Sequence, residues 1–176
     1  DLDFFFTLGD IRLVRGRSID DPAALLVEGC DAILVTTGLD QPLRLGIPGE
    51  MELMGRGVST CGVCDGAFFK DKKTMVIGGG DSAMEEATFL TKFASKVYIV
   101  HRRDELRASK IMQDRAFANE KIEFVWNSEV ADVLGGDSVT GVQLRSTVDG
   151  TLRDLPLDGL FIAIGNDPRT HLVHDK

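Results

Sequence analysis

The sequence predicts an α/β fold in which a parallel sheet with helices is joined to a small antiparallel β-meander. Three short apolar runs, at 74–77, 96–100 and 122–126, alternate with two segments whose apolar residues recur at helical spacing, 83–94 and 104–119. Alternating strands and helices are typical of a parallel sheet, because the chain must cross over one face of the sheet between neighbouring strands.

Beyond residue 128 the pattern changes to strands alone, which predicts the antiparallel meander. The breaks between its strands are Gly135-Gly136 and Asp149-Gly150, and we expect the second to be a two-residue hairpin turn. A last apolar run at 160–165 predicts a buried strand that closes the domain. The expected meander strands are 129–133, 139–146 and 151–155.

The first fifty residues differ, with strands expected at 10–14 and 32–36 and a helix at 22–27. Gly46-Ile47-Pro48-Gly49 is the strongest candidate for a linker, since glycine and proline break regular structure. This break separates residues 1–52 from an expected α/β domain at 53–165, which residues 166–176 follow.

The composition limits the classes of partner. A formal charge of −8 and a pI near 4.9 argue against binding to nucleic acid or to anionic membranes. No apolar run approaches the roughly 20 residues that span a bilayer, and three cysteines are too few for a disulfide scaffold. We therefore expect a cytoplasmic protein that binds neither nucleic acid nor membrane and holds no metal.

Gly78, Gly80 and Ala83 match G-x-G-x-x-A directly after an expected strand and before an expected helix. In a Rossmann-like, dinucleotide-binding domain the first glycine allows the tight turn, the second lets the backbone approach a pyrophosphate, and the third small residue lets the helix pack on the strand. Asp81 and Ser82 are candidate caps of the helix. The alternative is a plain glycine-rich connection. The candidate cofactor-binding residues here are Gly78, Gly79, Gly80, Asp81, Ser82 and Ala83.

The end of the second parallel strand indicates which dinucleotide binds. An NAD site normally offers Asp or Glu about twenty residues past the glycines, whereas this chain offers His101-Arg102-Arg103 and then Arg107. Guanidinium groups bind a 2′-phosphate through charge-assisted hydrogen bonds, so the pattern favours NADPH. If a helix begins near Asp104, Arg103 and Arg107 lie one turn apart and face the same anion. The alternative is a solvated basic helix start.

Cys61-Gly-Val-Cys64 is followed by Asp65, a dozen residues before the glycine turn. A redox pair needs only two neighbouring thiols, one of them available as thiolate. A zinc site would need four ligands, and the chain offers only Cys30 and three scattered histidines besides. Asp65 is a candidate proton donor and acceptor for thiol exchange, and Cys30 is expected to be an ordinary thiol beside a strand.

Three stretches together resemble the low-molecular-weight, bacterial and plant type of thioredoxin reductase: Cys61-Gly-Val-Cys-Asp-Gly, Gly78-Gly-Gly-Asp-Ser-Ala and His101-Arg-Arg-Asp-Glu-Leu-Arg107. The similarity extends from about 55 to 169 and includes the closing strand with Ile164 and Gly165, which we add to the candidate cofactor-binding residues. The resemblance implies that electrons pass from NADPH through FAD to the Cys61/Cys64 disulfide and on to thioredoxin, in a homodimer.

The resemblance also implies roles for the site residues. Cys64 would face the flavin, Cys61 would attack the disulfide of thioredoxin, and Asp65 would act as acid and base. Arg102, Arg103 and Arg107 would hold the 2′-phosphate. Gly55–Gly57 and Gly165 are expected to be hinges between the NADPH and FAD domains.

The chain departs from the family in ways that shape our expectations. Family members are roughly twice this length, the chain carries no G-x-G-x-x-G for FAD near its start, and Asn166 stands where the family usually has His. By the resemblance, residues 1–52 would be the C-terminal part of a first FAD-domain segment, 53–165 the NADPH-binding domain with the redox dithiol, and 166–176 the start of the return to the FAD domain. We therefore expect a piece of the enzyme that binds NADPH but does not retain FAD. Two alternatives are an electron-donor flavoprotein for a peroxiredoxin and a stand-alone NADPH-binding thiol redox sensor.

Overall fold

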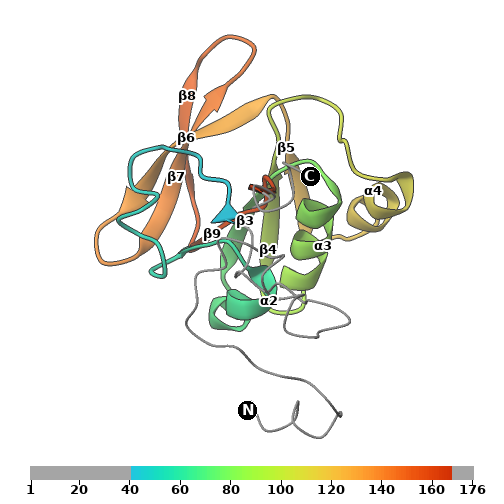
Figure 1. The fold of residues 1–176 in the computed structure, drawn as a ribbon, viewed down its shortest axis with the longest axis horizontal. Coiled ribbons are helices and arrows are strands. Elements are labelled where there is room, and N and C mark those ends of the chain that lie inside the picture. The colour runs from blue at the N-terminus through green and yellow to red at the C-terminus, as the bar shows by residue number, and fades with distance from the viewer. Residues whose placement is uncertain (1–40, 168–176) are drawn as a thin grey trace, which may run out of the picture. The chain divides into compact units, whose positions relative to one another are not determined.

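The computed structural model describes residues 41–167 (Figure 1). The elements expected at 10–14, 22–27 and 32–36 lie outside these residues, as does Cys30. The core of the described part is a five-stranded sheet in which every neighbouring pair is parallel. Its strands, in spatial order, are β2 (Val58–Ser59), β9 (Gly159–Ile162), β3 (Lys73–Ile77), β4 (Lys96–Val100) and β5 (Ile122–Val125).

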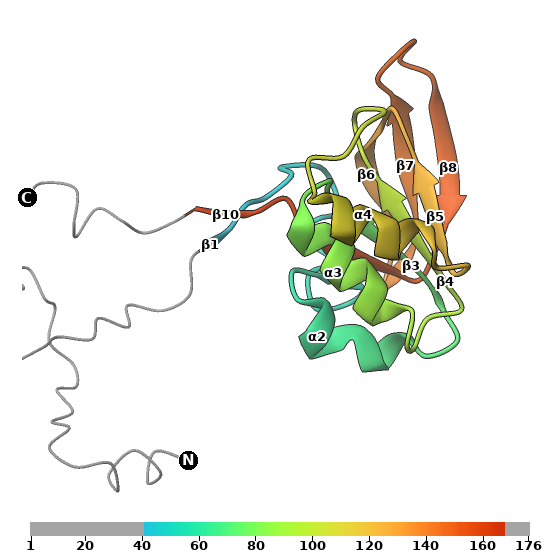
Figure 2. The same ribbon diagram turned by 90° about the vertical axis from the view of Figure 1, so that its right-hand side faces the viewer.

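Helices cover one face of this sheet and a second sheet covers the other (Figure 2). The helices are α2 (Gly62–Asp65), α3 (Asp81–Leu90) and α4 (Lys110–Phe117), and a 3-10 turn, η2 (Gly66–Phe69), follows α2. The second sheet is the antiparallel meander of β6 (Ser128–Gly135), β7 (Val139–Ser146) and β8 (Leu152–Pro156). The prediction of a parallel sheet with helices and a small meander is confirmed.

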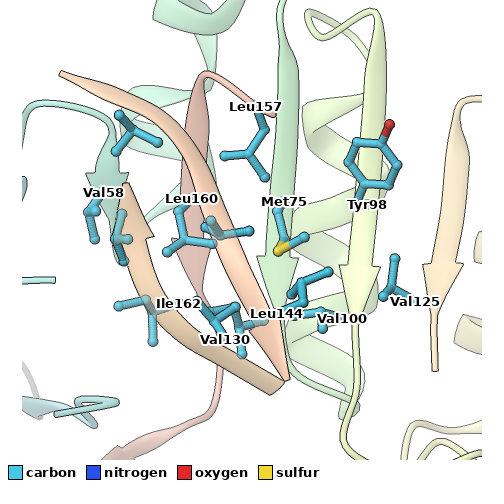
Figure 3. Packing of buried hydrophobic residues seen from close by; sticks show 14 of the residues in the cluster. Val58, Met75, Tyr98, Val100, Val125, Val130, Leu144, Leu157, Leu160 and Ile162 are labelled. Carbon is cyan, nitrogen blue, oxygen red and sulfur yellow. The ribbon is translucent and has the colours of Figure 1, made fainter. Parts of the chain in front are cut away.

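The two faces of the parallel sheet are buried in two separate cores. Alternate residues of β3 divide between them: Met75 and Ile77 pack toward the meander, and Val76 packs toward the helices. Strands buried on both faces read as continuous apolar runs, which explains why these runs could be found in the sequence. Figure 3 shows the core on the meander side, where Val130 and Leu144 approach Met75, Leu160 and Ile162 of the parallel sheet, with further labelled residues around them.

The turn between β7 and β8 is longer than the predicted two-residue hairpin. β7 ends at Ser146 and β8 begins at Leu152. Both the backbone N–H and the hydroxyl of Thr151 donate to Asp149 Oδ1, at 3.0 and 2.7 Å, and these bonds lower the pKa of Asp149 to about 2. This side-chain turn competes with strand pairing next to it, which is why the prediction was wrong.

The segment expected to be a linker packs against the meander. The Val133 N–H donates to the Pro48 carbonyl at 3.1 Å. The side chain of Glu50, which is 1% exposed, accepts hydrogen bonds from the backbone of Leu45 and Gly46. On either side of the domain, β1 (Gln41–Pro42) pairs antiparallel with β10 (Asn166–Asp167). The proposed domain boundaries remain a prediction.

No helix within residues 41–167 is both long and apolar enough to cross a membrane.

Candidate functional site

The glycine turn joins the end of β3 to the start of α3, and Gly78 can only be glycine. Its φ is +152°, and a Cβ there would lie 2.4 Å from the Ala163 carbonyl oxygen and 2.8 Å from the Ala83 Cβ. Ala83 is fully buried, so the small residue expected at this position does let the helix approach the turn. A Cβ at Gly80 would meet nothing within 4 Å. The space that a side chain at position 80 would enter is therefore open.

Gly79 is constrained by the side chain of His101, a contact that the sequence does not predict. A Cβ at Gly79 would lie 2.3 Å from the imidazole of His101, which is only 8% exposed and whose Nε2 is buried without a hydrogen-bond partner among the described residues. Burial lowers the pKa of His101. A hydrogen bond to the Glu105 backbone opposes this change, and the nearby arginines add to it. We infer that the neutral ring fills the space above the turn.

Replacing Gly79 with alanine is therefore expected to destabilise the domain by about 1–3 kcal/mol, because the buried ring must move to admit a methyl group. Gly80→Ala is the matched control, since the same methyl meets open space there. Urea unfolding of both variants measures the difference. Equal stability of the two would show that the His101 ring gives way freely.

The arginine-bearing loop lies against this turn because β3 and β4 are parallel neighbours and end at the same edge of the sheet. The Gly79 carbonyl accepts hydrogen bonds from the backbone N–H groups of Arg107, at 2.7 Å, and Ala108, at 3.0 Å. The Thr147 hydroxyl donates to the Arg102 carbonyl at 3.0 Å. Backbone hydrogen bonds therefore hold both ends of the loop, at Arg102 and at Arg107.

The predicted helix over 104–119 begins later than expected, at Lys110, so the proposal that Arg103 and Arg107 lie one helical turn apart is wrong. Bonds to the glycine turn use the N–H groups that an earlier helix would need. Arg102, Arg103 and Arg107 are exposed in this loop and form no ion pair with another described residue. Three exposed arginines without an ion pair among the described residues, next to the glycine turn, suit a phosphate-bearing ligand.

The predicted helix cap is also different. Gly80 occupies the cap position of α3 and Asp81 is the first helical residue, so neither Asp81 nor Ser82 caps the helix. The Asp81 carboxylate instead accepts a hydrogen bond from the backbone of Ser109, at 2.6 Å.

The two cysteines form a disulfide across the short helix α2, with their Cα atoms 5.3 Å apart. Cys61 occupies the cap position, and the Cys64 N–H donates to its sulfur at 3.2 Å. Asp65 ends the helix, and the Ser59 hydroxyl donates to Asp65 Oδ2 at 2.7 Å. Ser59 also accepts from the Cys61 N–H at 3.0 Å, which makes it a link between the candidate acid and the dithiol. Ser59 was not among the site residues predicted from the sequence, although a hydroxyl two residues before a turn is a recognisable signal.

A second carboxyl group lies beneath the dithiol helix. A Cβ at Gly62, between the cysteines, would lie 3.4 Å from Glu86 Oε2 of α3. This oxygen is buried and has no hydrogen-bond partner in the part of the chain that the structure describes. Burial raises the pKa of Glu86 from 4.5 to about 7, with Glu85 adding to the rise and the Gly62 backbone opposing it.

This carboxyl should make the stability of the domain depend on pH. Folded protein keeps the proton of Glu86 up to about pH 7, whereas the unfolded chain releases it near pH 4.5. The stabilisation is therefore complete below about pH 4.5 and is lost as the pH rises to about 7. The full pKa difference corresponds to roughly 3 kcal/mol, and solvent screening of this partly exposed group reduces it to about 1–2 kcal/mol.

Glu86→Gln is expected to remove this dependence and to be the more stable protein at pH 8 by about 1–2 kcal/mol. Urea unfolding at pH 4.5 and pH 8 measures the effect, and Glu120→Gln, at an exposed site just after α4, is the control. An identical pH dependence in Glu86→Gln and the wild type would contradict this assignment.

The remaining candidates lie at the exit of the domain. Ile164 is partly buried against the core on the meander side. Gly165 has a φ of +106°, and its carbonyl accepts from the Leu43 N–H at 3.0 Å. Gly55 and Gly57, the other expected hinge glycines, also have positive φ, at 73° and 120°. A hinge role for these positions remains a prediction.

Comparison with known proteins places these features in a wider group. The family model of the pyridine nucleotide-disulphide oxidoreductases matches residues 20–176. A thioredoxin reductase of Streptomyces coelicolor is 59% identical over 156 residues, covering 89% of this chain and 48% of that protein. One from Mycolicibacterium smegmatis is 60% identical over 174 residues, covering 95% of this chain and 56% of that protein. The chain spans about half the length of these curated relatives.

A solved structure shows the same arrangement of elements. The crystal structure of Lactococcus lactis thioredoxin reductase (FR conformation) matches with a TM-score of 0.74 and 47% sequence identity, over 77% of this chain and 45% of that one.

Proposed function

Because the chain belongs to the pyridine nucleotide-disulphide oxidoreductase family, we propose that it carries the NADPH-binding domain and the redox dithiol of a thioredoxin reductase. One observation carries the proposal. A Cys-x-x-Cys disulfide packs on α3, the same helix that opens at a dinucleotide-type glycine turn. A single rigid element thus connects a site for a soluble electron donor with a group that can be reduced.

NADPH would be held by the glycine turn and the arginine loop. The open space at Gly80 admits the pyrophosphate, where free N–H groups and the positive end of the α3 dipole favour an anion. Arg102, Arg103 and Arg107 would bind the 2′-phosphate through charge-assisted hydrogen bonds. His101, Ile164 and Gly165 would line the site. Bound NADPH supplies two electrons as a hydride.

The dithiol would pass these electrons to the disulfide of thioredoxin. In the reduced form, the Cys61 thiolate would attack the thioredoxin disulfide, and the Cys64 thiolate would then resolve the mixed disulfide between the two proteins. Asp65, held by the Ser59 hydroxyl, would donate and accept the protons of this exchange. The family uses FAD between NADPH and the dithiol. Residues 41–167 contain no second glycine turn that could hold FAD, so the thiol exchange described above involves only the two cysteines and Asp65.

The proposal extends to a homodimeric, cytoplasmic enzyme with thioredoxin as its partner. The similarity to thioredoxin reductases supports thioredoxin as the substrate. The net charge of −8 is consistent with a protein that avoids nucleic acid and anionic lipid.

Calorimetric titration of the chain with NADPH and with NADH tests the proposal. NADPH is expected to bind more tightly by about 1–3 kcal/mol, because only NADPH presents a phosphate to the arginines. An ultraviolet-visible spectrum of the purified chain is expected to show no flavin band. Failure to bind either nucleotide, or equal affinity for both, would overturn the assignment of the site.

A further inference from the structure

Asp81 places a negative charge beside the proposed pyrophosphate site. It is the first residue of α3, directly after the glycine turn where an anionic pyrophosphate is proposed to bind, and a negative charge there opposes such a ligand. It does not cap its own helix. Its Oδ1 instead accepts the backbone N–H of Ser109, 28 residues further along the chain, at 2.6 Å.

This bond completes a row of three. The backbone N–H groups of Arg107, Ala108 and Ser109 all donate to the glycine-turn segment, the first two to the Gly79 carbonyl and the third to Asp81. Of the three bonds, only the one to Asp81 uses a side chain. The row fixes the backbone from which the Arg107 side chain projects. The side chain itself is exposed and has no ionic partner among the described residues, so its direction depends on that backbone.

We propose that Asp81 is a positioning residue for nucleotide selectivity, which holds the Ser109 amide so that Arg107 points at the 2′-phosphate of NADPH. This inference rests on the proposed function. The carboxylate acts through Arg107 rather than on the nucleotide, and its repulsion of the pyrophosphate is offset by the arginine that it places. NADH lacks the 2′-phosphate and gains nothing from the arrangement.

Three variants test this role. Asp81→Ala removes the acceptor. Asp81→Asn keeps an oxygen at the same place without the charge. Ser109→Pro removes the donor while leaving Asp81 intact, and the Ser109 φ of −60° is compatible with proline. Each is titrated with NADPH and NADH by calorimetry, and thermal unfolding of each variant is recorded in parallel.

Asp81→Ala and Ser109→Pro are expected to reduce the ratio of NADPH to NADH affinity by about tenfold, through weaker NADPH binding. NADH affinity should stay the same or rise when the charge is removed, and Asp81→Asn should keep most of the wild-type ratio. If Asp81 had only a structural role, the variants would unfold at a lower temperature and bind NADPH and NADH more weakly to the same extent. The ratio of the two affinities would then be unchanged.

An unchanged ratio in both Asp81→Ala and Ser109→Pro overturns the inference. The inference is also overturned if Asp81→Asn lowers the ratio of NADPH to NADH affinity as much as Asp81→Ala does. The effect would then come from the charge and not from the hydrogen bond. If the wild type itself shows no preference for NADPH, the proposed function fails instead, so the two failures are distinguishable.

Discussion

Replacing Cys64 with serine is expected, under the proposed function, to lower NADPH-dependent reduction of thioredoxin, assayed with FAD present, by at least about a thousandfold. The Cys61–Cys64 disulfide accepts an electron pair by becoming two thiols. With one cysteine missing, the remaining thiol cannot store that pair, nor resolve a mixed disulfide with thioredoxin. Cys61→Ser should have the same effect. Turnover with thioredoxin and a chromogenic disulfide measures the loss.

The third cysteine of the chain provides the matched control for this experiment. Cys30→Ser makes the same chemical change outside the dithiol and should leave turnover close to that of the wild type. NADPH affinity should be unchanged in all three variants, because the glycine turn and the arginine loop are separate from α2. Substantial thioredoxin reduction by Cys64→Ser would mean that another group accepts the electrons, and the role of the dithiol would have to be abandoned.

The triple variant Arg102→Ala, Arg103→Ala and Arg107→Ala is expected to weaken NADPH binding by about a hundredfold and to leave NADH binding nearly unchanged. Hydrogen bonds to charged groups contribute about 1.5–3 kcal/mol each, and neighbouring groups on one phosphate do not add fully. The side chains are exposed and unpaired with other described residues, so their removal should not disturb the fold. Calorimetry with both nucleotides measures the change.

A second triple variant controls for the loss of positive charge. Lys70, Lys72 and Lys92 are exposed and lie just before β3 or just after α3, at the opposite end of these elements from the glycine turn. Their replacement by alanine changes the net charge equally. This control should keep the preference for NADPH. If both triple variants lose NADPH affinity to the same extent, the arginine loop acts only through the overall charge. The 2′-phosphate would then not bind at Arg102, Arg103 and Arg107.

The regular elements were predictable because each is governed by its own sequence. Strands β3 and β4 are buried from their second residue onward and mostly apolar there, and the predicted bounds agree with the structure to within one residue. Gly78 and Ala83 could be assigned their roles because those roles depend on local backbone geometry. The dithiol was recognisable for the same reason, as its two sulfurs lie within one turn of chain.

What could not be predicted depends on contacts between distant segments. The late start of α4 follows from hydrogen bonds that residues 107–109 make to the glycine turn, and nothing near Asp104 signals them. The need for glycine at position 79 comes from the ring of His101. Glu86 appears in the sequence as one more helical glutamate, and its raised pKa arises only when α2 covers it.

The pairing of β1 with β10 has a consequence for engineering. Gln41 lies opposite Asp167, and Pro42 opposite Asn166, so the chain enters and leaves the domain at one place. A domain with adjacent ends can be transplanted into a surface loop of an unrelated host, or circularised, without stretching its backbone. The segment between these two strands can therefore be moved as one unit, together with both the glycine turn and the dithiol.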